Sequence, residues 1–210
     1  MSFLAIFLAG FLWLIKSAYK KYEAEIFALK KFEKMSILNL QFLSDNLEFI
    51  QEWLNFLKTG QSYSFHFGHY IINYEEVSKL SNIDLINKVM YLNYKLERIN
   101  FDFDNFYKGH QENVLKINSM EKEQKLVVSS EYNKIVSQWL EKMENDRTFL
   151  ENELIDVIAN IRVVANAKSQ SFFGYLNFLF IHVYPRITQE KIEIAIKNLK
   201  KEIAEKTRGI

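Results

Sequence analysis

The stretch FLAIFLAGFLWLI, residues 3–15, opens the run of sequence that decides the fold of this chain. It carries no charged side chain, and no proline interrupts the run from Met1 to Leu57. Beyond Lys16, positions 40, 43, 47, 50, 54 and 57 are all leucine or isoleucine, with the alternating steps of three and four residues that define a heptad. The run predicts one long helix, apolar at its beginning and amphipathic afterwards.

The apolar beginning predicts a transmembrane anchor over residues 1–19. Residues 1–15 would extend about 22 Å as a helix, which is less than the roughly 30 Å of a hydrocarbon core. A lysine near the end of a span lengthens it by reaching the lipid headgroups with its ammonium group. A buried helix and a cleaved signal peptide are the alternatives, the second disfavoured because no basic residue precedes the apolar run. The expected membrane-interface residues are Lys16, Tyr19, Lys20, Lys21 and Tyr22.

Six lysines between residues 16 and 34 all lie on the C-terminal side of the apolar segment. The bias of lysine and arginine towards the inner side predicts a single-pass protein of the cell membrane, with its N-terminus outside. Residues 20–210 would then form a cytoplasmic helical domain. The absence of cysteine fits a reducing compartment without requiring one.

Composition favours helices in the remainder, because a chain of 210 residues with six glycines and one proline has few breakpoints. Ser81 with Asp84 is expected to open a second long helix, antiparallel to the first and weakening near Gly109. A break is expected between Gly109 and Ser130, followed by a third helix through residues 132–164 and a last one from Thr188. The apolar face of this last helix is expected to comprise Ile192, Ile196, Leu199 and Ile203. Residues 61–72 are expected to be an extended connector. The predicted fold class is all-α: an N-terminal transmembrane helix that continues into an antiparallel bundle of three to four long helices, with coiled-coil character.

Several classes of function lack their characteristic motifs in this sequence. A net charge of +1 argues against a nucleic-acid-binding domain. No glycine-rich phosphate loop, G-x-S-x-G motif or nucleophilic cysteine occurs, so neither an enzyme nor a cofactor is expected. His66 and His69 are three residues apart, which on an extended segment points them to opposite faces, so no metal site is expected.

Two stretches are left with more than one interpretation. Arg98, Asn100 and Asp102 form a polar cluster in the second long helix, either as a surface ion pair between Arg98 and Asp102 or as part of a ligand pocket. The segment from Phe172 to Tyr184 is apolar almost all round but only about 20 Å long as a helix, too short to span. It is either buried in the bundle or lies in the inner membrane interface.

The function expected from these features is a non-enzymatic interaction or scaffold module at the inner face of the membrane. Its expected partners are membrane lipid and either an unidentified protein or a second copy of the chain. The alternative is a sensor-type helical bundle that binds a small ligand between its helices.

Overall fold

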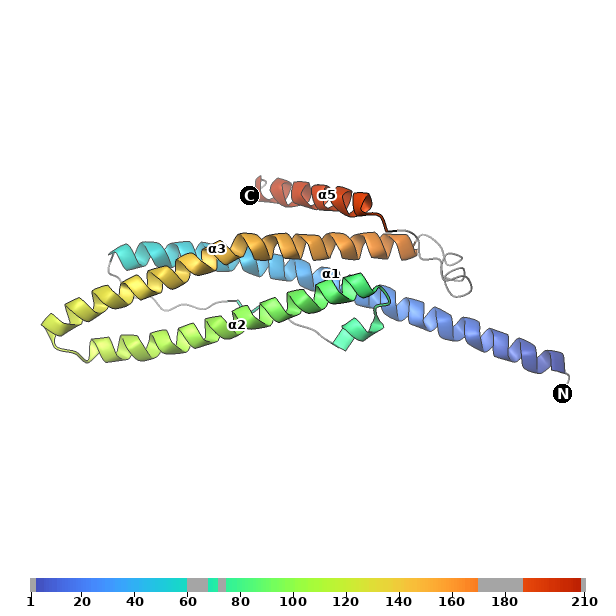
Figure 1. Ribbon diagram of the computed structural model, residues 1–210, viewed down its shortest axis with the longest axis horizontal. Coiled ribbons are helices and arrows are strands. Elements are labelled where there is room, and N and C mark those ends of the chain that lie inside the picture. Colours follow the sequence, from blue (N-terminus) through green and yellow to red (C-terminus); the bar gives the residue numbers. More distant parts are fainter. Residues whose placement is uncertain (1–2, 60–67, 72–74, 170–186, 209–210) are drawn as a thin grey trace. The chain divides into compact units, whose positions relative to one another are not determined.

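The computed structural model describes residues 3–59, 68–71, 75–169 and 187–208. In these ranges the regular elements are four α-helices and one 3-10 helix, in the order α1 (Phe3–Thr59), η1 (Glu75–Lys79), α2 (Ile83–Asn118), α3 (Lys122–Ser169) and α5 (Gln189–Arg208) (Figure 1). This confirms the all-α class and the three long helices followed by a shorter one. The segment Phe172–Tyr184, with His66 and His182, lies outside the described residues.

The chain divides into two compact units, and α1, α2 and α3 each contribute to both. Unit 1 comprises Met1–Ile37, Asn73–Met90 and Ile155–Ile210, and unit 2 comprises Leu38–Ile72 and Tyr91–Leu154. The division expected at residue 19 falls inside α1, which runs through it as a continuous helix.

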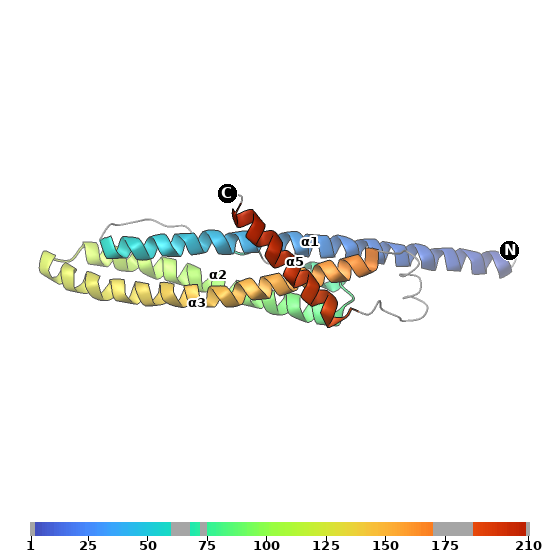
Figure 2. The same ribbon diagram turned by 90° about the horizontal axis from the view of Figure 1, so that it is seen from above.

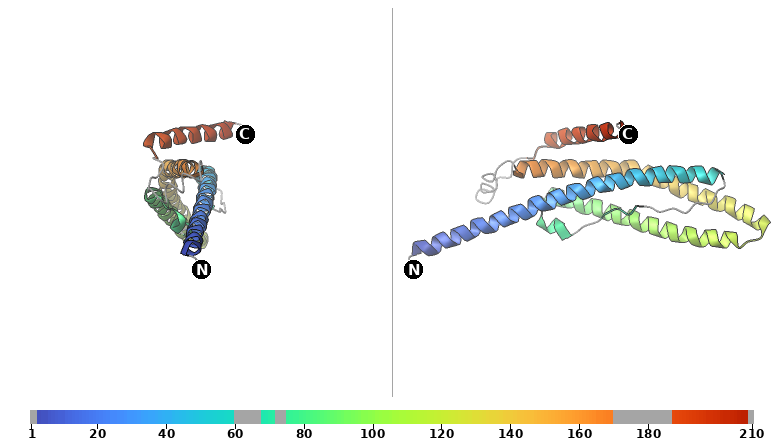
Figure 3. Two further views of the ribbon diagram at one scale, coloured as in Figure 1. Left: turned by 90° about the vertical axis from the view of Figure 1, so that its right-hand side faces the viewer. Right: turned by 180° about the vertical axis from the view of Figure 1, so that it is seen from behind.

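In unit 1 the first part of α1 is antiparallel to the last part of α3. The Tyr22 hydroxyl donates to the Lys168 carbonyl at 3.0 Å, and Arg162 Nε donates to the Glu33 carboxylate at 2.7 Å, so rising numbers on α1 meet falling numbers on α3. Helix α5 packs beside the last part of α3 (Figure 3). The apolar contact between α5 and its neighbours comprises Ile37, Ile155, Ile158, Ile196, Leu199 and Ile203. The apolar face predicted for the last helix is therefore confirmed.

In unit 2, α2 and α3 form an antiparallel pair (Figures 1 and 2). Phe103 meets Trp139 with ring centroids 5.8 Å apart, and further along α2 His110 Nδ1 lies 2.8 Å from the Tyr132 hydroxyl of α3. Buried apolar side chains fill the space between the helices, among them Leu43, Ile50, Leu96, Phe103, Val136, Leu140 and Leu150. Burial of such side chains stabilises the unit by about 1.5–3 kcal/mol each.

Helices α1 and α2 run parallel in unit 2, so the antiparallel arrangement expected for them is wrong. The evidence is the extended segment Gly68–Ile71, which bonds to Asn46 through Gly68 and to Asn39 through Ile71. The same segment bonds to Asn100 through Tyr70 and to Asp104 through His69. It is antiparallel to both helices, which must therefore point the same way. A connection that runs back along α1 before α2 begins has this effect.

Two helix boundaries differ from those expected. The N-cap of α2 is Asn82, whose Oδ1 accepts from the Leu85 amide at 2.8 Å, whereas the Ser81 side chain binds Glu25. Helix α2 also continues through Gly109 to Asn118, because one glycine costs a helix only about 1 kcal/mol. The break expected between Gly109 and Ser130 lies at residues 119–121.

No helix in the described ranges combines the length with the apolar character that crossing a membrane requires, so the transmembrane helix expected within residues 1–19 is not supported.

Candidate functional site

The beginning of α1 in unit 1 exposes eight large apolar side chains between residues 3 and 14, here called the apolar end. Phe3 is 87% exposed and Trp13 is 67% exposed. The apolar end comprises Phe3, Ile6, Phe7, Leu8, Phe11, Leu12, Trp13 and Leu14, all of them exposed. Soluble proteins seldom expose contiguous apolar surface on this scale without a binding role.

The five expected membrane-interface residues directly follow the apolar end. Lys16, Tyr19, Lys20 and Lys21 are exposed, whereas Tyr22 is half-buried and its hydroxyl donates to the Lys168 carbonyl. Their contact with a membrane stays a prediction.

A buried ion pair joins α1 and α3 further along unit 1. Glu25 Oε2 and Lys168 Nζ lie 2.5 Å apart, and their side chains are only 6% and 9% exposed. Ser81 completes the group, because its amide and hydroxyl both donate to Glu25 Oε1, at 2.7 and 2.6 Å, while its Oγ accepts from Lys168 Nζ at 2.7 Å. Each charge therefore has a partner of opposite sign and a further hydrogen bond, which is the arrangement that burial of ions demands.

Other ion pairs in unit 1 are more exposed. Glu76 contacts Lys31 at 3.2 Å and Lys79 at 2.6 Å, and these two ammonium groups, Lys79 first, lower the pKa of the Glu76 carboxyl. Arg162 of α3 binds Glu33 of α1 and Glu202 of α5, which ties the last helix to the others. These pairs orient the helices and suggest no chemistry of their own.

Three asparagine side chains in unit 2 bind the main chain of Gly68–Ile71, and together they are called the asparagine site. Asn46 accepts from the Gly68 amide at 2.9 Å and donates to the Gly68 carbonyl at 3.0 Å. Asn100 does the same for Tyr70, both at 2.9 Å, and Asn39 does so for Ile71 at 2.7 and 3.0 Å. A primary amide offers one acceptor and two donors in one plane, so it can replace the edge of a neighbouring β-strand.

The spacing of Asn39 and Asn46 matches the spacing of the residues that they bind. Seven residues of α-helix rise about 10.5 Å, and the three steps from Gly68 to Ile71 extend about 10 Å. Both asparagines are buried, at 2% and 4% exposed. Their alignment on one face of α1 follows from the seven-residue separation, which is two helical turns.

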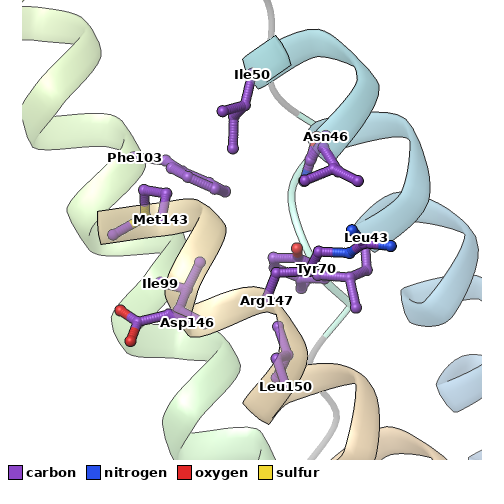
Figure 4. A pocket seen from close by; sticks show the side chains of 11 residues that line it. Leu43, Asn46, Ile50, Tyr70, Ile99, Phe103, Met143, Asp146, Arg147 and Leu150 are labelled. Carbon is purple, nitrogen blue, oxygen red and sulfur yellow. The ribbon is translucent and has the colours of Figure 1, made fainter. Parts of the chain in front are cut away.

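A small cavity adjoins the asparagine site (Figure 4). Its volume is about 20 Å³, the space that about one water molecule needs and far below the several hundred Å³ of a ligand pocket. Burial raises the pKa of the Tyr70 hydroxyl to about 12, although a hydrogen bond with Asn46 opposes the shift. The cavity is lined by Leu43, Asn46, Leu47, Ile50, Tyr70, Ile99, Phe103, Met143, Asp146, Arg147 and Leu150.

The described histidines have neighbours that account for them. His69 Nε2 lies 2.7 Å from Asp104 Oδ1 on an exposed surface. His110 lies among aromatic rings, with Trp53 edge-on at 4.9 Å between centroids, and burial lowers its pKa. Among the described residues, no group of three or more potential ligands is placed to hold a metal ion.

The polar cluster expected on the second long helix is divided in the structure. Arg98 is exposed and Asp102 is half-buried, whereas Asn100 belongs to the asparagine site. A role for these residues in binding a small ligand stays a prediction. Sequence reasoning missed Asn39 and Asn46. Their separation of seven residues beside an apolar heptad places them on one face of the helix but does not identify the main-chain groups that they bind.

Comparisons with models of protein families, with curated proteins and with solved structures produced no match to this chain.

Proposed function

We propose that this protein is a membrane-attached, non-enzymatic interaction module, in which the apolar end of α1 enters the lipid and the helical units hold a partner protein or a second copy at the membrane surface. The observation that carries the proposal is the exposure of the apolar end. Eight large apolar side chains in water forgo stabilisation on the order of 10 kcal/mol, which a covering environment would restore.

Lipid suits this surface better than a partner helix does. Successive helical residues are about 100° apart, so the four exposed residues Phe11, Leu12, Trp13 and Leu14 point in directions that encircle α1. A partner helix would cover a stripe on one side of α1, about 100° wide or somewhat more, whereas acyl chains surround a helix on all sides. The exposed lysines at 16, 20 and 21 then lie where headgroups would meet them.

The depth of insertion depends on Lys16. Residues 3–15 extend only about 20 Å as a helix, so a single-pass arrangement requires the Lys16 ammonium to reach the headgroups and the bilayer to thin locally. With the lysines on the inner side, the N-terminus would be outside, and unit 2 and the part of unit 1 beyond residue 19 would be cytoplasmic.

Membrane attachment is tested by placing charges in the apolar end. Leu8→Arg with Leu12→Arg should move the chain from carbonate-washed membranes to the supernatant, because a charged side chain in the hydrocarbon region costs about 2.5–3.5 kcal/mol. Leu115→Arg with Leu126→Arg is the matched control, since these leucines are 70% and 69% exposed but lie in unit 2. Release of both double variants, or of neither, would contradict the proposal.

Orientation can be measured directly because the chain has no cysteine. A single cysteine introduced at the exposed position Glu112 should react with a membrane-impermeant maleimide only after the cells are permeabilised. Labelling of intact cells would show that the helical units are outside.

A further inference from the structure

The asparagine side chains of the site bind the main chain of the segment Gly68–Ile71. Its six hydrogen bonds all involve amide or carbonyl groups of Gly68, Tyr70 and Ile71, and the segment supplies no side chain to them. Recognition of this kind resembles the addition of a strand to a sheet edge, where main-chain bonds give affinity and a few side-chain contacts give specificity.

Side-chain selectivity is confined to two positions of the segment. A Cβ at Gly68 would lie 3.3 Å from the Phe42 ring, so a larger residue there forces the ring to move. Tyr70 is 5% exposed and stacks on Phe103 with centroids 6.5 Å apart. His69 contacts Asp104 at 2.7 Å, but both side chains are exposed, and an exposed pair of this kind contributes little. The site therefore selects an extended segment with glycine first and an aromatic residue third.

The segment is held in a way that permits its replacement. Of its four residues only Tyr70 is buried, and the other three are exposed or half-buried. Loss of the segment would leave the amides of Asn39 and Asn46 without these partners, so an empty site should attract a segment of the same pattern. The sequence shown to satisfy the site is the chain's own, and every copy of the chain carries both the site and the segment.

We infer that the asparagine site also accepts Gly68–Ile71 of a second copy, and that reciprocal exchange of this segment joins two copies. Such exchange gives a closed two-fold dimer without any new contact chemistry. This inference deepens the proposed function by identifying the partner as the same chain. Attachment to one membrane would favour it, because tethering raises the local concentration of copies.

Complementation between two full-length variants tests the exchange. Asn46→Ala impairs the site and keeps the segment, whereas Tyr70→Ala impairs the segment and keeps the site. Neither variant should pair with itself, but mixed in detergent they should form a heterodimer, recovered through a tag on one chain. The control replaces Asn46→Ala by Asn55→Ala, an exposed asparagine on the same helix. This chain keeps both the site and the segment, so it should pair with itself as the parent does and should recover less of the Tyr70→Ala chain than Asn46→Ala does.

A peptide measurement keeps the test independent of folding defects in either variant. A labelled peptide of residues 66–73 should bind the Tyr70→Ala chain at least about tenfold more tightly than the parent, whose own segment competes at high effective concentration. The same peptide carrying Gly68→Val should bind neither chain. Peptide binding without a heterodimer would overturn the assignment to a second copy. Absence of both would overturn the inference that the asparagine site accepts any segment other than its own. Neither result depends on membrane attachment, which the arginine variants test separately.

Discussion

Removal of the ammonium from the buried ion pair in unit 1 is expected to be the most destabilising single change among the polar contacts described. Lys168→Met would leave the Glu25 carboxylate, on a side chain that is 6% exposed, without its opposite charge. Breaking such a pair from one side costs about 3–5 kcal/mol. The two hydrogen bonds from Ser81 remain and still stabilise the carboxylate, so we expect a loss near the lower end, about 3 kcal/mol.

Two comparisons identify the cause of that loss. Glu25→Leu combined with Lys168→Met removes both charges and should lose less stability than Lys168→Met alone, because no ion is left uncompensated. Lys201→Met disrupts an exposed pair, in which Lys201 and Glu205 lie 3.7 Å apart with side chains 77% and 66% exposed. Its effect should stay below about 1 kcal/mol.

Urea denaturation in mild detergent, followed by far-ultraviolet circular dichroism, measures all three variants against the parent. The reasoning would be refuted if Lys168→Met cost no more than Lys201→Met, or if the double variant were less stable than Lys168→Met alone. The first result would mean that water reaches the pair, and the second that the polar contacts contribute more than the burial of the charges costs.

Two further changes have a sign that the structure determines. Gly109→Ala should raise the free energy of unfolding by about 0.5–1 kcal/mol, because the glycine is inside α2 and a Cβ there meets nothing within 4 Å; thermal unfolding of the variant and the parent measures the difference. Glu76 has a lowered pKa in the folded protein, so its stabilising effect is complete above its ordinary pKa of 4.5 and is lost as the pH falls through the folded value. Thermal unfolding between about pH 6 and pH 3 should therefore show a steeper acid loss in the parent than in Glu76→Gln, and equal slopes would contradict the assignment.

Helices with strong periodicity could be predicted from the sequence. Leucine and isoleucine in steps of three and four located the amphipathic part of α1, and Ile192, Ile196, Leu199 and Ile203 identified the buried face of α5. These signals are local, because the repeat that defines the helix also defines its apolar face. The polar stretch after Gly109 likewise contained the break between α2 and α3.

Contacts between distant segments were not predictable in the same way. Ser81 resembles a helix cap in sequence, but a buried carboxylate of α1 competes for its hydroxyl, so Asn82 becomes the cap instead. The parallel direction of α1 and α2 depends on where the connector lies, which no periodicity encodes. Asn39 and Asn46 looked like ordinary polar positions beside a heptad, because their partners are main-chain groups that every residue possesses.

Seven residues of α-helix and three steps of extended chain cover nearly the same distance. Side chains seven residues apart on α1 can therefore bind main-chain groups three residues apart on an extended segment. The next positions in this series, seven residues before Asn39 and seven after Asn46, are Phe32 and Trp53. Both side chains are buried, with exposed fractions of 3% and 4%. Neither side chain has the acceptor and the donor that an asparagine amide presents. Within the described residues, the paired main-chain hydrogen bonds from α1 therefore come from two positions, Asn39 and Asn46. The asparagines of α1 are thus spaced to bind one short extended segment, of the length of Gly68–Ile71, and not a strand that continues along the helix.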